Sequence, residues 1–120
     1  MFKVTKTQHV LAVNDLAASE KFYVGMLGFE VNFRVEGWCF LNLDNFYLML
    51  GHCAGDLLAS ETNNHSYFAY VNCEGIDDLY ETYRSRGVQF TQPLANKPWG
   101  QREFGVVTPE GHRIMFGQTI

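Results

Sequence analysis

The sequence is poor in the features that mark several large classes of protein. Only 18% of its 120 residues are charged, and nine Lys and Arg against thirteen Asp and Glu give a net charge of −4. Nucleic-acid-binding domains usually contain a basic patch, and the densest basic pair here is Arg84 with Arg86. There is no run of about 18 apolar residues, the length that a membrane-spanning helix needs. We therefore expect neither a nucleic-acid partner nor a membrane partner.

Cysteine is also scarce. Cys39, Cys53 and Cys73 form an odd number without Cys-x-x-Cys spacing, which suits neither a disulfide framework nor a closed zinc site. The first six residues lack the apolar stretch of a secretory signal peptide. These features predict reduced thiols in a cytoplasmic protein.

Aromatic residues, in contrast, are plentiful. Ten Phe, six Tyr and two Trp make up 15% of the chain. A chain of this length buries roughly two-thirds of its unfolded surface, and this is more aromatic surface than a plain core of that size needs. Some aromatic side chains are therefore expected to line a cavity or to close an oligomer interface.

The same order of predicted elements occurs twice. In the first half, hydrophobic spacing predicts a helix that Asp15 caps and Gly28 ends, and strands on either side of it. The ranges are a strand at 7–13, the helix at 16–27, and strands at 29–35, 38–43 and 46–50. The second half predicts a strand at 66–71, a helix at 76–86, strands at 88–91, 101–107 and 112–116, and a loop at 92–98.

Matching segments indicate that this repetition is an internal duplication. Val13-Asn14 recurs as Val71-Asn72, and 48–51 (Leu-Met-Leu-Gly) recurs as 114–117 (Ile-Met-Phe-Gly). We predict an α+β fold made of two βαβββ modules, about 5–51 and about 65–118, joined by a connector at 52–64 within a single domain of residues 1–120. Curved sheets would enclose a cleft, with the helices on the outer faces.

Three segments match a known family in order and spacing. They are 9–16 with its continuation through Phe22-Tyr23 and 27–29, the segment 98–104, and the segment 108–113. Together they resemble the vicinal oxygen chelate superfamily, which includes glyoxalase I, fosfomycin and bleomycin resistance proteins and extradiol dioxygenases. The Trp-Gly-Gln-Arg-Glu-Phe segment most resembles the bleomycin-resistance branch, whose members bind a ligand without metal chemistry.

The resemblance also implies a homodimer, because a second subunit commonly completes the cavity in this family. Two arrangements remain open for this chain. Its two modules could pair with each other, or each could pair with a module of the partner subunit.

Enzymes of this family hold a divalent metal with four side chains, and the resemblance places those positions at Gln8, Met49, Ser66 and Met115. Two thioethers, an amide and a hydroxyl offer no negative charge and are poor ligands for such ions. We therefore expect no metal, no cofactor and no catalytic residue, and interpret the two methionines as pocket lining. A register slip of one residue would instead turn His9 and His65 into the cleft.

Strand alternation predicts which residues line the cleft. Apolar contacts are expected from Trp38, Phe40, Tyr47, Met49, Phe68, Trp99, Phe104 and Met115, and hydrogen bonds from Gln8, Asn42, Ser66 and Arg102. For the strand at 101–107, alternation does not decide which side chains point into the cleft. Repeat symmetry turns Arg102, Phe104 and Val106 inward, while the opposite choice would turn Glu103 and Gly105 inward. Glu103 could then serve as a general base, although an ion pair is the simpler interpretation.

These observations favour a metal-free protein that binds a planar or partly apolar small molecule, sequestering a drug or a metabolite. The alternative is a metal-dependent lyase, transferase or dioxygenase of the glyoxalase type. A third interpretation is a non-catalytic immunity or regulatory protein that holds a peptide in the cleft.

Overall fold

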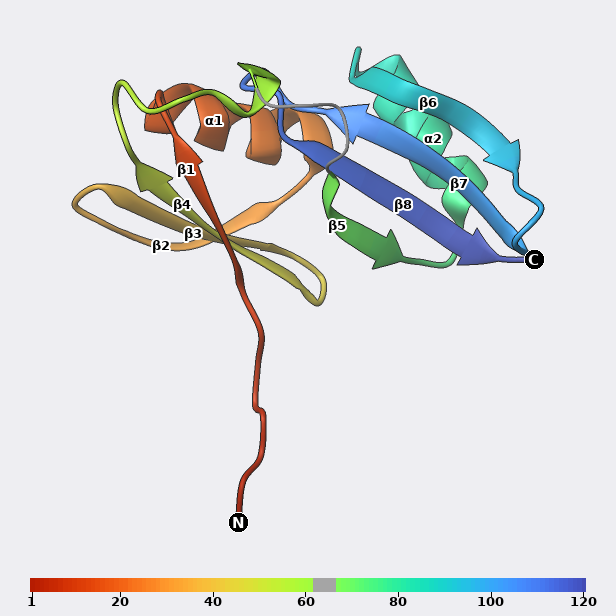
Figure 1. Ribbon diagram of the computed structural model, residues 1–120, viewed down its shortest axis with the longest axis horizontal. Helices are drawn as coiled ribbons and strands as arrows, with labels where there is room; N and C mark the ends of the chain where they lie inside the picture. Colours follow the sequence, from red (N-terminus) through yellow and green to blue (C-terminus); the bar gives the residue numbers. More distant parts are fainter. Residues whose placement is uncertain (62–66) are drawn as a thin grey trace. The chain divides into compact units, whose positions relative to one another are not determined.

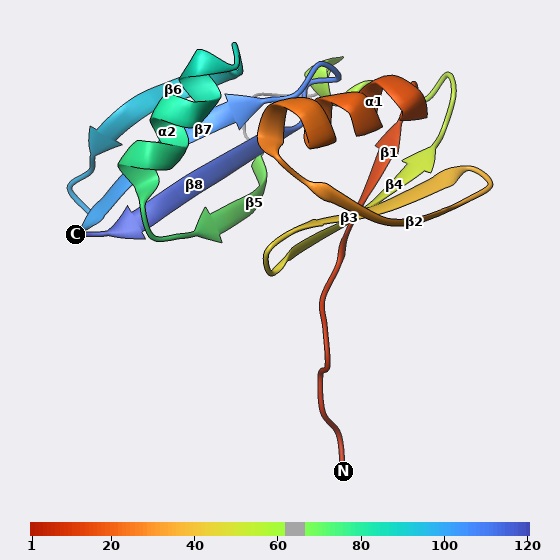
Figure 2. The same cartoon turned by 180° about the vertical axis from the view of Figure 1, so that it is seen from behind.

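The computed structural model describes residues 1–61 and 67–120 and divides into two compact units, Met1–Asp56 and Leu57–Ile120 (Figure 1). We call them module 1 and module 2. In each module, four strands form one sheet and a helix packs on one face of that sheet (Figure 2). Each sheet therefore has a second, helix-free face.

Module 1 follows the order β-α-β-β-β. Its elements are β1 (His9–Val13), α1 (Leu16–Phe22), a π-helical turn (Tyr23–Leu27), β2 (Glu30–Val35), β3 (Trp38–Leu43) and β4 (Phe46–His52). The strand order is β1-β4-β3-β2, with β1 parallel to β4 and the other pairs antiparallel. The predicted helix signals are confirmed: the Asp15 carboxylate accepts a hydrogen bond from the Ala18 amide at 2.9 Å, and Gly28 ends the helix with φ 87°.

Module 2 repeats this order after a short 3-10 turn (Ala59–Glu61). Its elements are β5 (Tyr67–Asn72), α2 (Ile76–Ser85), β6 (Gln89–Asn96), β7 (Gln101–Val107) and β8 (Arg113–Thr119). The strand order is β5-β8-β7-β6, with β5 parallel to β8. The α+β fold of two βαβββ modules is thus confirmed.

Each module has its own core between its helix and its sheet. The side chains that are at most 1% exposed include Tyr23, Leu27, Leu41, Leu48 and Leu50 in module 1, and Tyr83, Phe104, Val106, Ile114 and Phe116 in module 2. Burying an aliphatic or aromatic side chain of this size stabilises a fold by about 1.5–3 kcal/mol. The face of each sheet that packs against its helix is therefore fixed by hydrophobic burial.

The predicted loop at 92–98 is wrong over most of its length, because β6 continues through Pro93 to Asn96. Proline lacks a backbone N–H and is tolerated in edge strands and at bulges. β6 is an edge strand, and its pairing with β7 shifts between Phe90 and Gln92 and again between Gln92 and Ala95. Pro93 lies in the second irregular stretch, where an unbroken ladder is not required.

Within the described ranges, no helix combines the length and the apolar character that crossing a lipid bilayer requires.

Candidate functional site

The helix-free face of module 1 contains most of the predicted contacts of the first half. In β1, Leu11 and Val13 are buried, whereas Val10 between them is 59% exposed and so points the other way. Met49 of β4 lies opposite Val10 on one side and Phe40 of β3 on the other. These register partners share one face.

Aromatic rings gather on this face. The ring of Phe40 stacks on that of Phe33 with centroids 4.2 Å apart and planes 13° apart, and the Trp38 ring is 6.3 Å from Phe40. Trp38 lies against Gly51, where a Cβ atom would come within 2.9 Å of the indole. The glycine therefore lets the indole lie close to the sheet.

Polar groups border these rings. Tyr47 and Asn42 are register partners, and the Lys6 ammonium lies 4.2 Å from the centre of the Tyr47 ring. The Asn42 side-chain oxygen accepts a hydrogen bond of 2.6 Å from the Asn32 amide. Trp38, Phe40, Asn42, Tyr47 and Met49 thus lie on one face, as alternation predicts. Their binding of a ligand stays a prediction.

Phe33 is not among the predicted site residues, although it is 53% exposed and stacks on one of them. Val31 pairs with Leu41, whose side chain is buried, so strict alternation would place Phe33 on the helix side as well. The pairing shifts between Val31 and Phe33, and this bulge turns Phe33 toward Phe40. Only the register with the neighbouring strand reveals it.

The helix-free side of module 2 contains a groove of about 410 Å³. It is lined by Tyr67, Thr91, Gln92, Val107, Arg113 and Met115. Gly105 lies opposite Met115 in the sheet, and a Cβ atom there would come within 2.7 Å of the Met115 sulfur and would also clash with the Thr91 hydroxyl. The glycine makes room for these two side chains.

A buried carboxylate lies on the same face, further along β7. Glu103 is 2% exposed, and its Oε1 accepts a hydrogen bond of 2.9 Å from the indole Nε1–H of Trp99, which is 65% exposed. Burial, and then a hydrogen bond with Glu103, raise the pKa of the Tyr70 hydroxyl. The Tyr70 hydroxyl has a single proton, and Gln101 Oε1, 3.4 Å away, is a second acceptor for it.

The position of Glu103 on the helix-free face shows which side chains of β7 point to that face, a choice that alternation had left open. The predicted ligand contacts of Phe104 and Arg102 are therefore corrected. Phe104 is 0% exposed and stacks on Phe116 with centroids 5.3 Å apart, so it belongs to the core under α2. Arg102 points the same way and forms an ion pair with Asp77 of α2 at 2.7 Å. Hydrophobic burial of Phe104 outweighs the repeat symmetry, which would have turned both side chains inward.

A second difference concerns β5. Its pairing with β8 shifts between Tyr67 and Ala69, so Phe68 falls in a bulge and Tyr67 lies opposite Arg113. The groove is accordingly lined by Tyr67 in place of Phe68, whose ring packs edge-on against His112 at 6.0 Å. Ser66, another predicted contact, lies outside the described residues.

The four positions that would hold the family metal do not offer the ligands that a divalent ion needs. Gln8 is exposed just before β1, Met49 is half-buried on β4, and Met115 is 4% exposed. Ser66 is not described, but its hydroxyl adds no charge. Amide, hydroxyl and thioether donors do not fit an ion that prefers carboxylate, imidazole or thiolate ligands.

The described part of the chain places no three His, Cys, Asp or Glu side chains where they could share a metal ion. His9 does not exchange with Gln8 by a register slip, because it pairs with Leu48 and its ring packs edge-on against Phe46 at 5.4 Å. His65, the other histidine of that alternative, lies outside the described residues.

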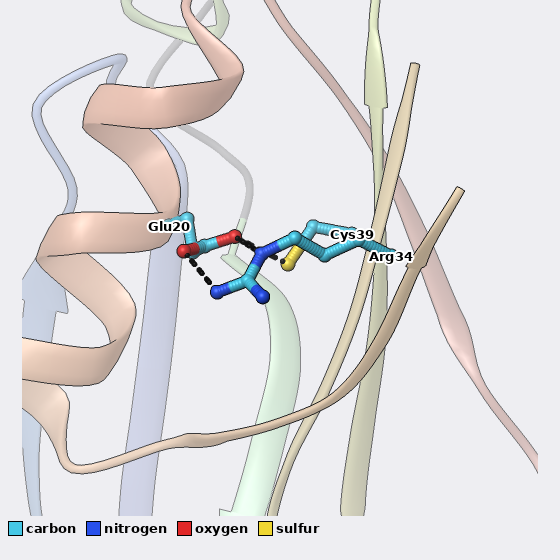
Figure 3. Close-up of polar contacts among 3 residues, drawn as sticks. All are labelled: Glu20, Arg34 and Cys39. Atoms are coloured by element: carbon cyan, nitrogen blue, oxygen red, sulfur yellow. Dashed lines mark hydrogen bonds and ion pairs between the residues drawn. The ribbon is translucent and has the colours of Figure 1, made fainter. Parts of the chain in front are cut away.

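On the helix side of module 1, a polar cluster ties α1 to the sheet (Figure 3). The Glu20 carboxylate accepts hydrogen bonds from Arg34 Nε at 2.7 Å and Nη2 at 2.8 Å, and from the Cys39 thiol at 3.1 Å. The hydrogen bonds from Arg34 and Cys39 lower the pKa of Glu20 to about 2. Burial, with the contact to Glu20, raises the pKa of the Cys39 thiol to about 12. A thiol in this state is protonated and a poor nucleophile.

A sequence profile described as "Glyoxalase/Bleomycin resistance protein/Dioxygenase superfamily" matches residues 6–116, nearly the whole chain. The chain belongs to this superfamily. Its two βαβββ modules are the fold that solved members of the superfamily share.

Among curated relatives, a bleomycin resistance protein of Geobacillus stearothermophilus is 27% identical over 123 residues, covering 92% of this chain and 93% of the relative. A glyoxalase/bleomycin resistance protein/dioxygenase structure from Alicyclobacillus acidocaldarius superposes with a TM-score of 0.84 at 19% identity, covering 96% of this chain and 91% of the other. A bleomycin-binding protein of Streptomyces verticillus, solved with copper(II)-bleomycin, is 26% identical with a TM-score of 0.75 and 97% coverage of both chains.

Proposed function

We propose that this superfamily member binds a planar or partly apolar small molecule without a metal of its own, and so sequesters a drug or a metabolite. The observation on which this rests is the aromatic helix-free face of module 1. Flat rings bind flat ligands by stacking, with a preference for offset or edge-to-face geometry. The stack of the exposed Phe33 ring on the half-buried Phe40 ring, and the adjacent Trp38, offer such surfaces.

The chemistry of the metal positions supports a binding role over the glyoxalase-type enzyme. Gln8, Met49 and Met115 supply no charged ligand, so the metal centre of a lyase, transferase or dioxygenase would lack the groups that hold it. The sequence relationship to proteins named for bleomycin resistance agrees with this choice.

We further propose that the protein works as a homodimer in the cytoplasm. Val10, Phe33 and Val35 are each more than half exposed on the face proposed to bind the ligand, and a second copy would complete the cavity over this face, with the ligand held between the two subunits. Cys39, Cys53 and Cys73 are all free thiols, the state that a reducing compartment maintains.

The test is a binding titration with metal-free bleomycin as the first probe, followed by a panel of planar aromatic drugs. Saturable binding is expected, and Phe40→Ala should weaken it about tenfold or more, the factor that corresponds to losing a stacking contact of roughly 1.4 kcal/mol. Phe90→Ala is the matched control. Phe90 is also a half-buried strand residue, but its ring packs with Tyr80 and Phe104 on the helix side.

Two results would contradict the proposal. One is equal weakening by the Phe40 and Phe90 variants, which would mean that loss of packing, not loss of a ligand contact, lowers the affinity. The other is about one tightly held divalent ion per subunit in elemental analysis, with turnover that depends on it. That result would favour the glyoxalase-type enzyme.

A further inference from the structure

We propose that Glu103 is a positioning residue. Its buried carboxylate holds the exposed Trp99 indole in one orientation, so the ring forms a ready-made stacking surface for a planar ligand. The choice of ligand rests on the proposed function. The contact between the carboxylate and the indole exists without any ligand and can be tested alone.

The backbone around Trp99 is fixed by the tight turn between β6 and β7. The Lys97 amide donates to the Gln101 carbonyl at 2.7 Å, and the Gly100 amide donates to the Lys97 carbonyl at 3.1 Å. Pro98 follows Lys97 in the turn, where its ring presets φ. Gly100 closes the turn with φ 83°, a left-handed conformation that glycine adopts without strain. Trp99 therefore leaves the turn in a defined direction.

The Trp99 side chain is fixed as well. Its Nε1–H donates to Glu103 Oε1 at 2.9 Å, although the indole is 65% exposed. An exposed side chain usually loses rotamer freedom when a ligand binds, and this loss lowers the affinity. A ring that is already held by a buried acceptor avoids most of that loss.

Glu103 is suited to this task because its own side chain is held in place by burial and by hydrogen bonding. It is 2% exposed, and a buried carboxylate requires hydrogen-bond donors. The Trp99 indole donates to it at 2.9 Å, and the Tyr70 hydroxyl lies beside it and shares its single proton between Glu103 and Gln101 Oε1. Gly117 allows this arrangement, since a Cβ atom there would clash with the Tyr70 hydroxyl. Hydrogen bonds to an ionised acceptor are also stronger than neutral ones.

Burial also defines what Glu103 does not do. With 2% of its surface exposed, the carboxylate has little access to a ligand, so it acts through Trp99 and is not a contact residue. The candidate role of a general base is therefore the weaker interpretation of this residue.

The first experiment follows hydrogen exchange of the Trp99 indole N–H by NMR in protein without ligand. The chain has two tryptophans, so the Trp38 indole serves as an internal reference. In Glu103→Leu, exchange at Trp99 should be about tenfold faster or more, the factor expected on losing a hydrogen bond to a charged acceptor. Glu103→Gln keeps an acceptor oxygen without the charge, so its exchange rate should fall between those of the wild type and Glu103→Leu.

Unchanged Trp99 exchange in Glu103→Leu would overturn the inference. If that variant does not fold, the isosteric Glu103→Gln decides in its place, and a wild-type exchange rate at Trp99 would be equally contradictory. Acceleration at both indoles would also count against positioning, because it would indicate a general loosening of the fold.

The second experiment measures bleomycin affinity in Glu103→Gln, Trp99→Ala and the double variant. If Glu103 acts through Trp99, the Glu103 substitution weakens binding in the wild-type background and has no further effect once Trp99 is alanine. Equal effects in both backgrounds would point to a merely structural role. If the wild type does not bind bleomycin, the proposed function is contradicted for this ligand. The hydrogen-exchange experiment on Trp99 would still test the role of Glu103.

Discussion

At the scale of single residues, the best-defined interaction in module 1 is the Glu20 cluster, which lies away from the aromatic face. Glu20 on α1 receives two hydrogen bonds from Arg34 on β2 and one from Cys39 on β3. Three elements that are separate in sequence therefore meet at one carboxylate. The cluster fixes the helix over the outer half of the sheet and leaves the thiol protonated.

The pH dependence of stability follows from the lowered pKa of Glu20. A carboxyl whose pKa falls from 4.5 in the unfolded chain to about 2 in the folded protein stabilises the fold above pH 4.5. This contribution is lost as the pH falls from 4.5 through 2. The difference in free energy of unfolding between the wild type and Glu20→Gln should thus be largest at neutral pH and shrink in that window.

Urea unfolding at pH 7, 5 and 3 measures this difference. Glu81→Gln is the control, because Glu81 and Arg84 form an ion pair of 3.1 Å in which both side chains are more than 60% exposed. Exposed pairs contribute little to stability, so this variant should stay close to the wild type throughout. A Glu20→Gln deficit that is the same at pH 3 as at pH 7 would contradict the role assigned to the carboxylate.

At the scale of elements, local signals predicted where helices begin and end. Asp15 and Gly28 act on their own neighbourhood, and the structure confirms the cap at Asp15 and the left-handed conformation at Gly28. The face of the sheet to which a strand side chain points depends on the neighbouring strands, which are remote in sequence. Bulges at Asn32 and at Phe68 could not be foreseen for that reason.

The same argument applies to β7. Alternation allowed either of two sets of β7 side chains to pack under α2. The burial of Phe104 against Tyr80, Tyr83 and Phe116 decides between them. The predicted orientation of side chains was therefore most accurate on β3 and β4, whose antiparallel pairing runs without a shift from Trp38 to Leu43.

Gly105 is a position on β7 where the packing leaves no room for a larger side chain. In Gly105→Ala, the new methyl group would meet the Met115 sulfur at 2.7 Å and the Thr91 hydroxyl. Overpacking of this kind costs roughly 1–3 kcal/mol, and chemical denaturation should detect it as a lower unfolding midpoint.

Gly25→Ala is the matched control for this substitution. Gly25 lies in the π-helical turn of module 1, and nothing lies within 4 Å of an added Cβ atom. Alanine there should be neutral or stabilise by about 0.5–1 kcal/mol. Stability losses of the same size at both glycines would show that the clash at Gly105 is relieved without cost.

At the scale of the whole molecule, the proposed homodimer makes a prediction about mass and surface. Native mass spectrometry should find a species of twice the 13.7 kDa subunit. Phe33→Asp places a charge on the helix-free face of module 1, where Phe33 is 53% exposed, and should weaken dimerisation about tenfold or more.

The control for the dimer is Val24→Asp. Val24 is 40% exposed on the π-helical turn, away from that face, and the variant introduces the same charge. Dimer loss in both variants would indicate a general charge effect, and a monomeric wild type would contradict the homodimer itself.

Pro93 bears on how copies of this chain can meet. A free strand edge ordinarily displays a row of backbone donors and acceptors that can template a strand from another molecule, the route to uncontrolled aggregation. Along β6, proline removes one donor, and two irregularities in the pairing interrupt the row. This edge is therefore a poor template for cross-chain strand addition, and copies of this chain are not expected to join along β6.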